Sequence, residues 1–181
     1  TCTGKFDLVE KDNPINCWIY SAADGWGSHG PETLETAIRD SCNFYFNTVG
    51  YYLGQNENGE YVGDMTLLNK YAEMYGFDST SGIEISEMDP QIATADPTRA
   101  AMGQSNNAFT TSQLARYVTT LANSGTCYDL TLLDKITDAS GNTQEEPDPV
   151  VHNRLELPQD LWTTIHAGMH DVTINNGNGI F

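Results

Sequence analysis

Basic residues are scarce in this sequence. Lys and Arg together number 8 among 181 residues, whereas Asp and Glu number 25, and the net charge is −17. Nucleic acids and anionic lipid surfaces are bound through clustered Lys and Arg, so neither kind of partner is expected. Long apolar runs are absent as well, and none approaches the ~20 residues that a membrane-spanning helix needs. No secretion signal opens the chain, which starts at Thr1, and we expect it to be a piece of a longer protein.

Cysteines are few, and none stands in a C-x-x-C pair, so neither a zinc ribbon nor a thioredoxin-like site is expected. The four are Cys2, Cys17, Cys42 and Cys127. Cys2 and Cys17 would close a short loop in which Gly4 and Pro14 suit a tight bend. A disulfide between them and two unpaired thiols in a loop both fit the sequence, and the disulfide would place the chain outside the cytoplasm. No pattern indicates a bound metal or another cofactor.

Aromatic side chains are plentiful, with 9 Tyr, 6 Phe and 3 Trp, so the chain can bury a core. Apolar spacing and helix-end signals predict helices that start near Pro31, cover 44–53 and 64–75, follow a cap at Thr110 or Thr111, and start at Pro158. A short strand at 83–85 and a hairpin around 139–142 are also predicted, whereas the glycine-rich tail 175–179 is not expected to pack. The predicted fold class is mostly α with short strands, in one domain that covers 1–181.

The helical spacing also predicts which side chains face the core. In the third helix these are Leu67, Leu68, Tyr71, Ala72 and Tyr75, and in the fourth they are Leu114, Tyr117, Val118 and Leu121.

The segment Ser41-Cys42-Asn43 lies where the first predicted helix gives way to the second. Extended backbone is expected at such a break, and there residues i and i+2 point the same way while i+1 points opposite. Ser41 and Asn43 would then share a cleft, with Cys42 turned into the core. A hydroxyl that relays protons beside an amide that donates and accepts suits the binding of a peptide substrate. Ordinary helix-breaking and capping residues are the alternative interpretation of the same pattern.

Histidines are less favoured candidates for chemistry. His29 lies in a glycine loop that does not match G-x-S-x-G, which favours a packing or capping role. His166 and His170 are four positions apart, but H-E-x-x-H is not matched, and surface positions are favoured for both. With His152 they would define a metal hydrolase, the least favoured hypothesis, because no carboxylate or cysteine has the accompanying spacing.

An ordered series of short motifs runs through residues 15–140. It comprises Trp18, Ser28-His29-Gly30, Leu34, Ala37-Ile38, Ser41-Cys42-Asn43, Tyr45-Phe46, Leu53-Gly54, Tyr75-Gly76-Phe77, Gly82-Ile83-Glu84, Ala101-Met102-Gly103-Gln104, residues 110–115 and residues 121–125. In this order the motifs resemble class B penicillin-binding proteins, although no single motif is specific. The resemblance implies an extracytoplasmic D,D-transpeptidase that cross-links peptidoglycan and is acylated by β-lactams, within a parent protein anchored to the cell membrane.

The sequence departs from the family pattern in two of its three motifs. The family uses S-x-x-K for the nucleophile and its base, then S-x-N, then K-[ST]-G on a strand that lines the cleft. Here only the middle motif is present: no Ser is followed by Lys three residues on, and no Lys by Ser or Thr and then Gly. The chain therefore resembles the helical subdomain of the α/β, β-lactamase-like transpeptidase fold, cut off at both ends. We expect the isolated chain to be inactive and to expose apolar surface that promotes self-association.

The resemblance also implies roles for individual residues. Ser41 would exchange protons with the missing lysine and the leaving amine, and Asn43 would hydrogen-bond the side-chain amide of the acyl donor. Gly103 and Gln104 would support the substrate cleft. Peptidoglycan stem peptides and β-lactams would be the partners of the full-length protein. The alternative from another class is a non-catalytic acidic extracellular interaction module, which explains the charge and the missing nucleophile but not the ordered motifs.

Overall fold

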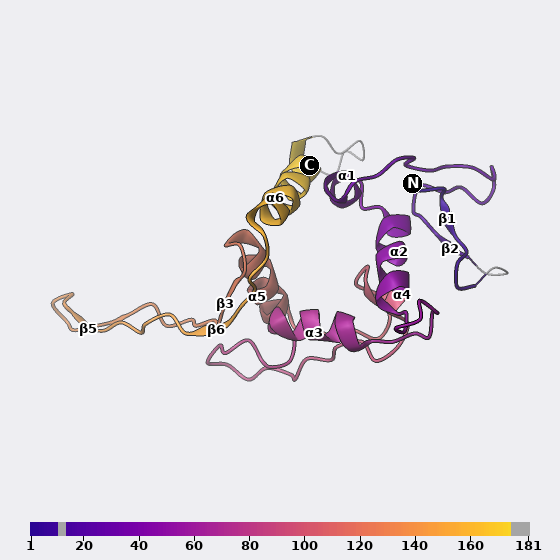
Figure 1. The fold of residues 1–181 in the computed structure, drawn as a ribbon. Helices are drawn as coiled ribbons and strands as arrows, with labels where there is room; N and C mark the ends of the chain where they lie inside the picture. Colours follow the sequence, from indigo (N-terminus) through magenta and orange to yellow (C-terminus); the bar gives the residue numbers. More distant parts are fainter. Residues whose placement is uncertain (11–13, 175–181) are drawn as a thin grey trace. The chain divides into compact units, whose positions relative to one another are not determined.

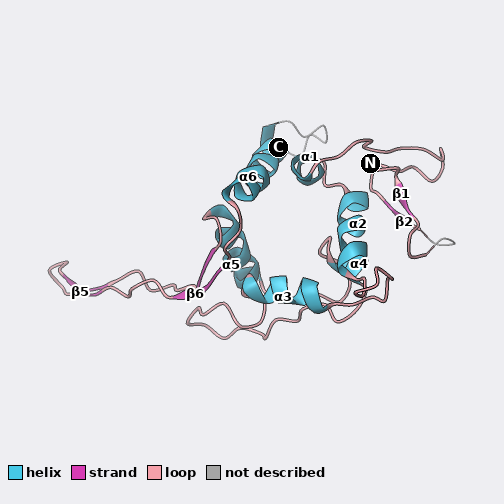
Figure 2. Ribbon diagram, in the orientation of Figure 1, coloured by secondary structure: helices cyan, strands magenta, loops and turns pink. Residues whose placement is uncertain are grey.

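A computed structural model describes residues 1–10 and 14–174, so the predicted glycine-rich tail lies outside the described residues. The chain is largely helical with short strands, as predicted (Figures 1 and 2). It forms two compact units. The first unit comprises Thr1–Leu68, Ala93–Asn107 and Leu157–Phe181, and the second unit comprises Asn69–Ile92 and Ala108–Glu156.

The elements are short, and the strands pair only two at a time. The helices are α1 (Leu34–Arg39), α2 (Asn43–Leu53), α3 (Thr66–Met74), α4 (Pro97–Ala100), α5 (Thr111–Ala122) and α6 (Gln159–Ile174). The strands are β1 (Lys5–Phe6), β2 (Ile15–Asn16), β3 (Thr126–Tyr128), β4 (Ile136–Thr137), β5 (Thr143–Glu145) and β6 (Val151–Arg154). Antiparallel pairs form between β1 and β2, β3 and β6, and β4 and β5. The β4–β5 pair confirms the predicted hairpin.

The first helix begins later than the sequence predicted. Thr33, and not Pro31, caps α1, because the Thr33 hydroxyl accepts from the Thr36 N–H at 3.2 Å. The Thr36 hydroxyl in turn accepts from the Thr33 N–H at 2.9 Å, which completes a reciprocal capping box. Proline and the acidic residue after it therefore stand outside the helix, and the prediction of a start near Pro31 is wrong.

The predicted strand at 83–85 is absent, since the structure assigns no strand there. The Glu84 carboxylate accepts from the Leu132 N–H at 2.8 Å and from the Thr131 hydroxyl. Ile85 is 60% exposed. The Glu84 side chain therefore connects this segment to residues 131–132, and no backbone hydrogen bonds of a β-ladder are formed there.

The first unit is built around cysteines rather than large apolar side chains. Cys2, Cys17, Ala37 and Cys42 form its buried centre, and Ile19 and three aromatic residues of α2 pack against them. In this unit α1 packs on α6, and α2 packs on α4. Trp162 of α6 is 2% exposed.

The second unit buries the polar face of α5, against prediction. Leu114 and Val118 are 45% and 49% exposed, whereas Gln113, Arg116 and Thr120 are buried. The Arg116 guanidinium donates to the carbonyls of Gly76, Ser79 and Thr80 and lies 3.4 Å from an Asp129 oxygen. Arginine has five donors in a fixed fork, so this ring of acceptors is what allows its burial.

The inward face predicted for the third helix is only partly correct, since Leu68, Ala72 and Tyr75 are half-buried. Leu67 and Tyr71 are 47% and 45% exposed.

Gly50 of α2 permits the close approach of α4. A Cβ atom on Gly50 would lie 2.2 Å from the Pro97 carbonyl oxygen and 2.7 Å from the Thr98 Cα. Alanine in place of glycine in a helix interior ordinarily stabilises by about 1 kcal/mol. We expect Gly50→Ala instead to lower the free energy of unfolding by about 1–3 kcal/mol, because the added methyl group would clash with the backbone of Pro97 and Thr98. Urea unfolding measures the change, and the neighbouring half-exposed Val49→Ala should stay within about 0.5 kcal/mol.

The hydrogen bonds of Glu87 in the second unit predict that the folded state loses stability in acid. Its carboxylate accepts from the Ser81 N–H at 2.6 Å and from the hydroxyls of Thr110 and Ser112. Desolvation raises the pKa of Glu87, but these hydrogen bonds outweigh it and lower the pKa from 4.5 to about 2. A carboxyl group whose pKa is lower in the folded protein stabilises the folded state at pH values above its unfolded pKa. This contribution to stability disappears as the pH falls from 4.5 towards 2.

We therefore expect the urea midpoint of the wild type to fall across that acid range. Glu87→Gln should start lower at neutral pH and show a flatter decline. Glu57→Gln, at an exposed position of the first unit, should follow the wild-type profile. Parallel acid profiles for the wild type and Glu87→Gln would contradict the assignment.

Candidate functional site

The junction between α1 and α2 is a defined helix end. The Cys42 N–H donates to the Ala37 carbonyl at 2.9 Å, and the Ser41 N–H donates to the Ile38 carbonyl at 3.2 Å. Ser41 has φ +50, in the left-handed region. This is the Schellman arrangement, in which a glycine usually takes the left-handed position and an apolar contact joins the residues at its two ends. Ala37 and Cys42 supply that contact, since both are 0% exposed.

The same turn places the three predicted site residues differently in the fold. Ser41 is exposed, Cys42 is buried as predicted, and Asn43 is half-buried as the first residue of α2. Extended backbone was expected at all three residues, whereas only Cys42 is extended, with φ −74 and ψ 98. Ser41 and Asn43 therefore flank a buried residue through a helix end and a helix start. Their catalytic and binding roles stay predictions.

Gly103 and Gln104 form the turn that ends α4, and both are exposed. Gly103 has φ +83, and its N–H donates to the Ala100 carbonyl at 3.0 Å. Met102, just before this turn, lies 3.5 Å from the Asn47 side-chain nitrogen, which also donates to the Asn43 carbonyl at 2.7 Å. The buried Asn47 thus connects the turn to the first turn of α2. The supporting role of Gly103 and Gln104 in a substrate cleft stays a prediction.

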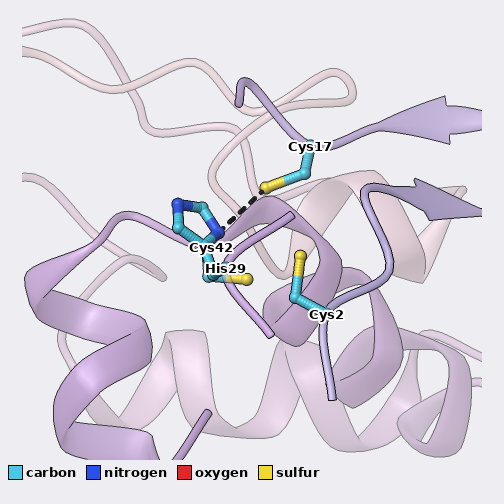
Figure 3. A group of neighbouring side chains, drawn as sticks. All are labelled: Cys2, Cys17, His29 and Cys42. Carbon is cyan, nitrogen blue, oxygen red and sulfur yellow. Dashed lines mark hydrogen bonds between the residues drawn. The ribbon is translucent and has the colours of Figure 1, made fainter. Parts of the chain in front are cut away.

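A group of metal-ligating side chains lies directly beneath this junction. The Sγ atoms of Cys2, Cys17 and Cys42 and a ring nitrogen of His29 all lie within 4.8 Å of one another. Figure 3 shows the three sulfurs and the imidazole directed into one shared space. The Cys17 Sγ is 3.5 Å from the His29 Nδ1. All four cysteines of the chain are free thiols in the structure.

The thiols of this group differ in acidity. The hydrogen bond from Cys42 lowers the pKa of Cys17 to about 4, even though burial opposes the shift. The same bond, with desolvation, raises the pKa of Cys42. Backbone N–H groups of Phe44 and Ile19 also lower the pKa of Cys17. The hydrogen bond between the two sulfurs thus favours loss of a proton from Cys17 and retention of one at Cys42, and the short approach of the sulfurs suits either a disulfide or a cation.

This group is not predictable from the sequence, because its ligands come from four separate segments. More than ten residues separate each ligand from the next, so no zinc motif is matched. The Cys2–Cys17 disulfide stays a prediction, since the two thiols do lie close together. Cys42 and His29 are the members that sequence reasoning left out, and only the fold brings them there.

The histidines of the metal-hydrolase hypothesis lie in different units. His152 of β6 contacts Asp78 and Asp129 in the second unit, at 3.5 and 3.2 Å. His166 and His170 belong to α6 of the first unit. Within residues 1–10 and 14–174, only the three cysteines with His29 form a potential metal-binding group. The structure therefore gives no support to a site made of the three histidines.

The sequence matches the profile of the penicillin binding protein transpeptidase domain over residues 6–180. The chain belongs to this transpeptidase family. Within the described part of the chain, no helix combines the length and the apolar character that crossing a membrane requires.

About a quarter of the aligned residues are identical between this chain and its curated relatives. Peptidoglycan D,D-transpeptidase MrdA of Haemophilus influenzae is 27% identical over 170 residues, which cover 83% of this chain and 24% of MrdA. Penicillin-binding protein 2B of Streptococcus pneumoniae serotype 2 is 25% identical over 190 residues, which cover 95% of this chain and 27% of that protein. The chain thus spans about a quarter of the length of these relatives.

Solved transpeptidase structures share the fold. Penicillin-binding protein 2B of Streptococcus pneumoniae strain R6 superposes with a TM-score of 0.75 at 23% identity, over 98% of this chain and 31% of the other. Penicillin-binding protein A of M. tuberculosis, solved as an imipenem acyl-enzyme complex, gives a TM-score of 0.71 at 18% identity, over 95% of this chain and 37% of the other.

The left-handed backbone of Ser41 predicts that the junction is less stable than it could be. A non-glycine residue in this region is strained by roughly 1–2 kcal/mol, and such strain often marks functional positions. We expect Ser41→Gly to stabilise the chain by about 0.5–1 kcal/mol in urea unfolding. Ser105 is the comparison, since it has φ +68 but its hydroxyl donates to the Ala95 carbonyl at 2.8 Å. Ser105→Gly should therefore gain nothing, and a destabilised Ser41→Gly would contradict the strain.

Proposed function

We propose that this chain is the helical part of the transpeptidase domain of a peptidoglycan D,D-transpeptidase, which cross-links stem peptides by serine acyl transfer. Support comes from the family match over residues 6–180 and from the order of motifs through residues 15–140. A curated relative is itself named a peptidoglycan D,D-transpeptidase, and a relative of the same fold was solved acylated by imipenem. On this proposal the parent protein is extracytoplasmic and anchored to the cell membrane.

The observation that carries the proposal is the local geometry of Ser41-Cys42-Asn43, where the end of α1 passes directly into the start of α2. A helix end with two backbone hydrogen bonds precedes Cys42, and a helix start follows it. Catalytic groups need such fixed supports, because small displacements cost large factors in rate. An exposed serine hydroxyl and a half-buried amide are thus presented at one constrained point of the fold.

Within the whole protein, Ser41 relays protons between the lysine base and the leaving amine. Asn43 hydrogen-bonds the side-chain amide of the acyl donor, since an amide side chain both donates and accepts. Gly103 and Gln104 support the cleft from the turn after α4. The substrates are stem peptides, and β-lactams act as acylating analogues of them.

The isolated chain is inactive on this proposal. Acyl transfer needs a nucleophile close to its base, together with donors for the developing oxyanion. The chain contains neither S-x-x-K nor K-[ST]-G. Exposed apolar side chains such as Leu114 and Val118 favour self-association of the isolated chain.

Labelled penicillin tests the role of Ser41 in the longer protein that carries this chain. We expect Ser41→Ala to lower the second-order acylation rate by roughly 10²–10⁴-fold, the usual contribution of a positioned acid or base. Ser140→Ala, in the turn between β4 and β5, is the matched control and should acylate at the wild-type rate. Equal rates for Ser41→Ala and the wild type would remove Ser41 from the mechanism. Absence of acylation in the wild type would favour the non-catalytic acidic module.

Intact-mass spectrometry tests the chain by itself. After incubation with penicillin, the 181-residue chain should keep its unmodified mass, because it has no acylation motif. A stoichiometric adduct would overturn the assignment of the nucleophile to polypeptide outside this sequence.

A further inference from the structure

We propose that Cys2, Cys17, His29 and Cys42 bind one Zn²⁺ ion as a structural Cys₃His site. The ion would lie beneath the α1–α2 junction and hold the central residue of Ser41-Cys42-Asn43. Three thiolates and one imidazole form one of the usual ligand sets of closed, tetrahedral zinc sites. The proposal does not depend on the transpeptidase activity, since it concerns only side chains of the first unit.

The spacing of the ligand atoms fits a tetrahedral ion. Sulfur and nitrogen ligands at about 2.3 and 2.1 Å from zinc lie about 3.6–3.8 Å apart along the edges of a tetrahedron. The Cys17 Sγ and His29 Nδ1 are 3.5 Å apart, and the remaining pairs lie within 4.8 Å. Changes of about 1 Å in side-chain position would therefore complete the geometry without any change of backbone.

The surroundings of the group favour a cation. The Glu32 side chain is only 2% exposed, its Oε1 lies 3.8 Å from the His29 Nδ1, and that oxygen has no hydrogen-bond partner in the structure. A buried acceptor without a protein partner usually faces a water molecule or an ion, so this oxygen points to a position for one of them beside the imidazole. Cys42 is also the N-cap residue of the 11-residue helix α2, where the helix dipole offsets part of the negative charge of a metal-bound thiolate.

A disulfide would engage fewer of these four side chains than a zinc ion. Any one disulfide joins two of the three cysteines and leaves the third thiol buried beside the imidazole. A zinc ion engages all four side chains, displaces up to three thiol protons and leaves none of the sulfurs unused. Three soft sulfur ligands also distinguish the site from calcium and magnesium sites, which use oxygen ligands.

The ion would add a link between segments that already touch, since the Phe6 ring of β1 packs on Phe44 and Tyr51 of α2. The Cys2 N–H donates to the Gly30 carbonyl and the Cys17 N–H donates to the Gly4 carbonyl, both at 2.7 Å. Cys2 and Cys17 flank the β1–β2 pair, which has only two residues in each strand. Zinc would attach this small hairpin to the loop of His29 and to the helix junction, so the position of Asn43 would depend on the metal.

Metal content of the reduced, purified 181-residue chain tests the proposal directly. We expect one zinc per chain by elemental analysis, and thiolate-to-metal charge-transfer and d–d bands of a tetrahedral site after replacement by Co²⁺. Chelation should lower the thermal midpoint, and added Zn²⁺ should restore it. These measurements use the wild type, so they remain decisive even if a variant fails to fold.

Variants identify the ligands. Cys17→Ser, Cys42→Ser and His29→Gln should weaken zinc binding by at least roughly 10–100-fold, the loss seen when even a residue next to a ligand is changed. Cys127→Ala is the matched control, because Cys127 is a buried thiol of the second unit and should leave the stoichiometry at one. A reduced wild-type chain without zinc, or a chain whose mass shows two hydrogens lost to a disulfide that zinc cannot prevent, would overturn the proposal.

Discussion

The burial of Cys42 is the constraint on which the first unit depends. Its backbone closes the end of α1, its position caps the start of α2, and its sulfur lies at the centre of the core. Two helices therefore change direction around one side chain that has no exposed surface. The position of Cys42 also fixes those of Ser41 and Asn43, because Ser41 belongs to the turn that ends α1 and Asn43 is the first residue of α2.

The two units solve the problem of a small core in different ways. Compact chains of this size normally bury large aliphatic side chains. The first unit buries cysteines and alanine with aromatic residues around them, whereas the second buries an arginine whose two terminal nitrogens donate to carbonyl groups and whose Nε has no partner. Polar burial of this kind costs little only when every donor meets an acceptor. The aromatic and polar character of both cores follows from a sequence in which only 39% of the residues are hydrophobic.

Local signals in the sequence predicted the helices well, and long-range contacts limited the rest. The starts of α2, α5 and α6 lie within one residue of the predicted positions, because caps and apolar spacing act within one or two turns. The buried face of α5 does not, because Arg116 is satisfied by carbonyls some forty positions earlier. Ser41 was correctly placed at a helix junction, but its left-handed backbone was not foreseen in a residue other than glycine. The cysteine group was missed because its ligands meet only after folding.

The enclosed sulfur of Cys42 also has a kinetic consequence. Reagents that alkylate thiols can reach it only when the first unit opens locally, since none of its surface meets solvent. Its labelling rate therefore reports how often the boundary between α1 and α2 opens transiently. Because Cys42 lies between Ser41 and Asn43, local opening of this part of the chain can be followed through a natural side chain, without an added probe.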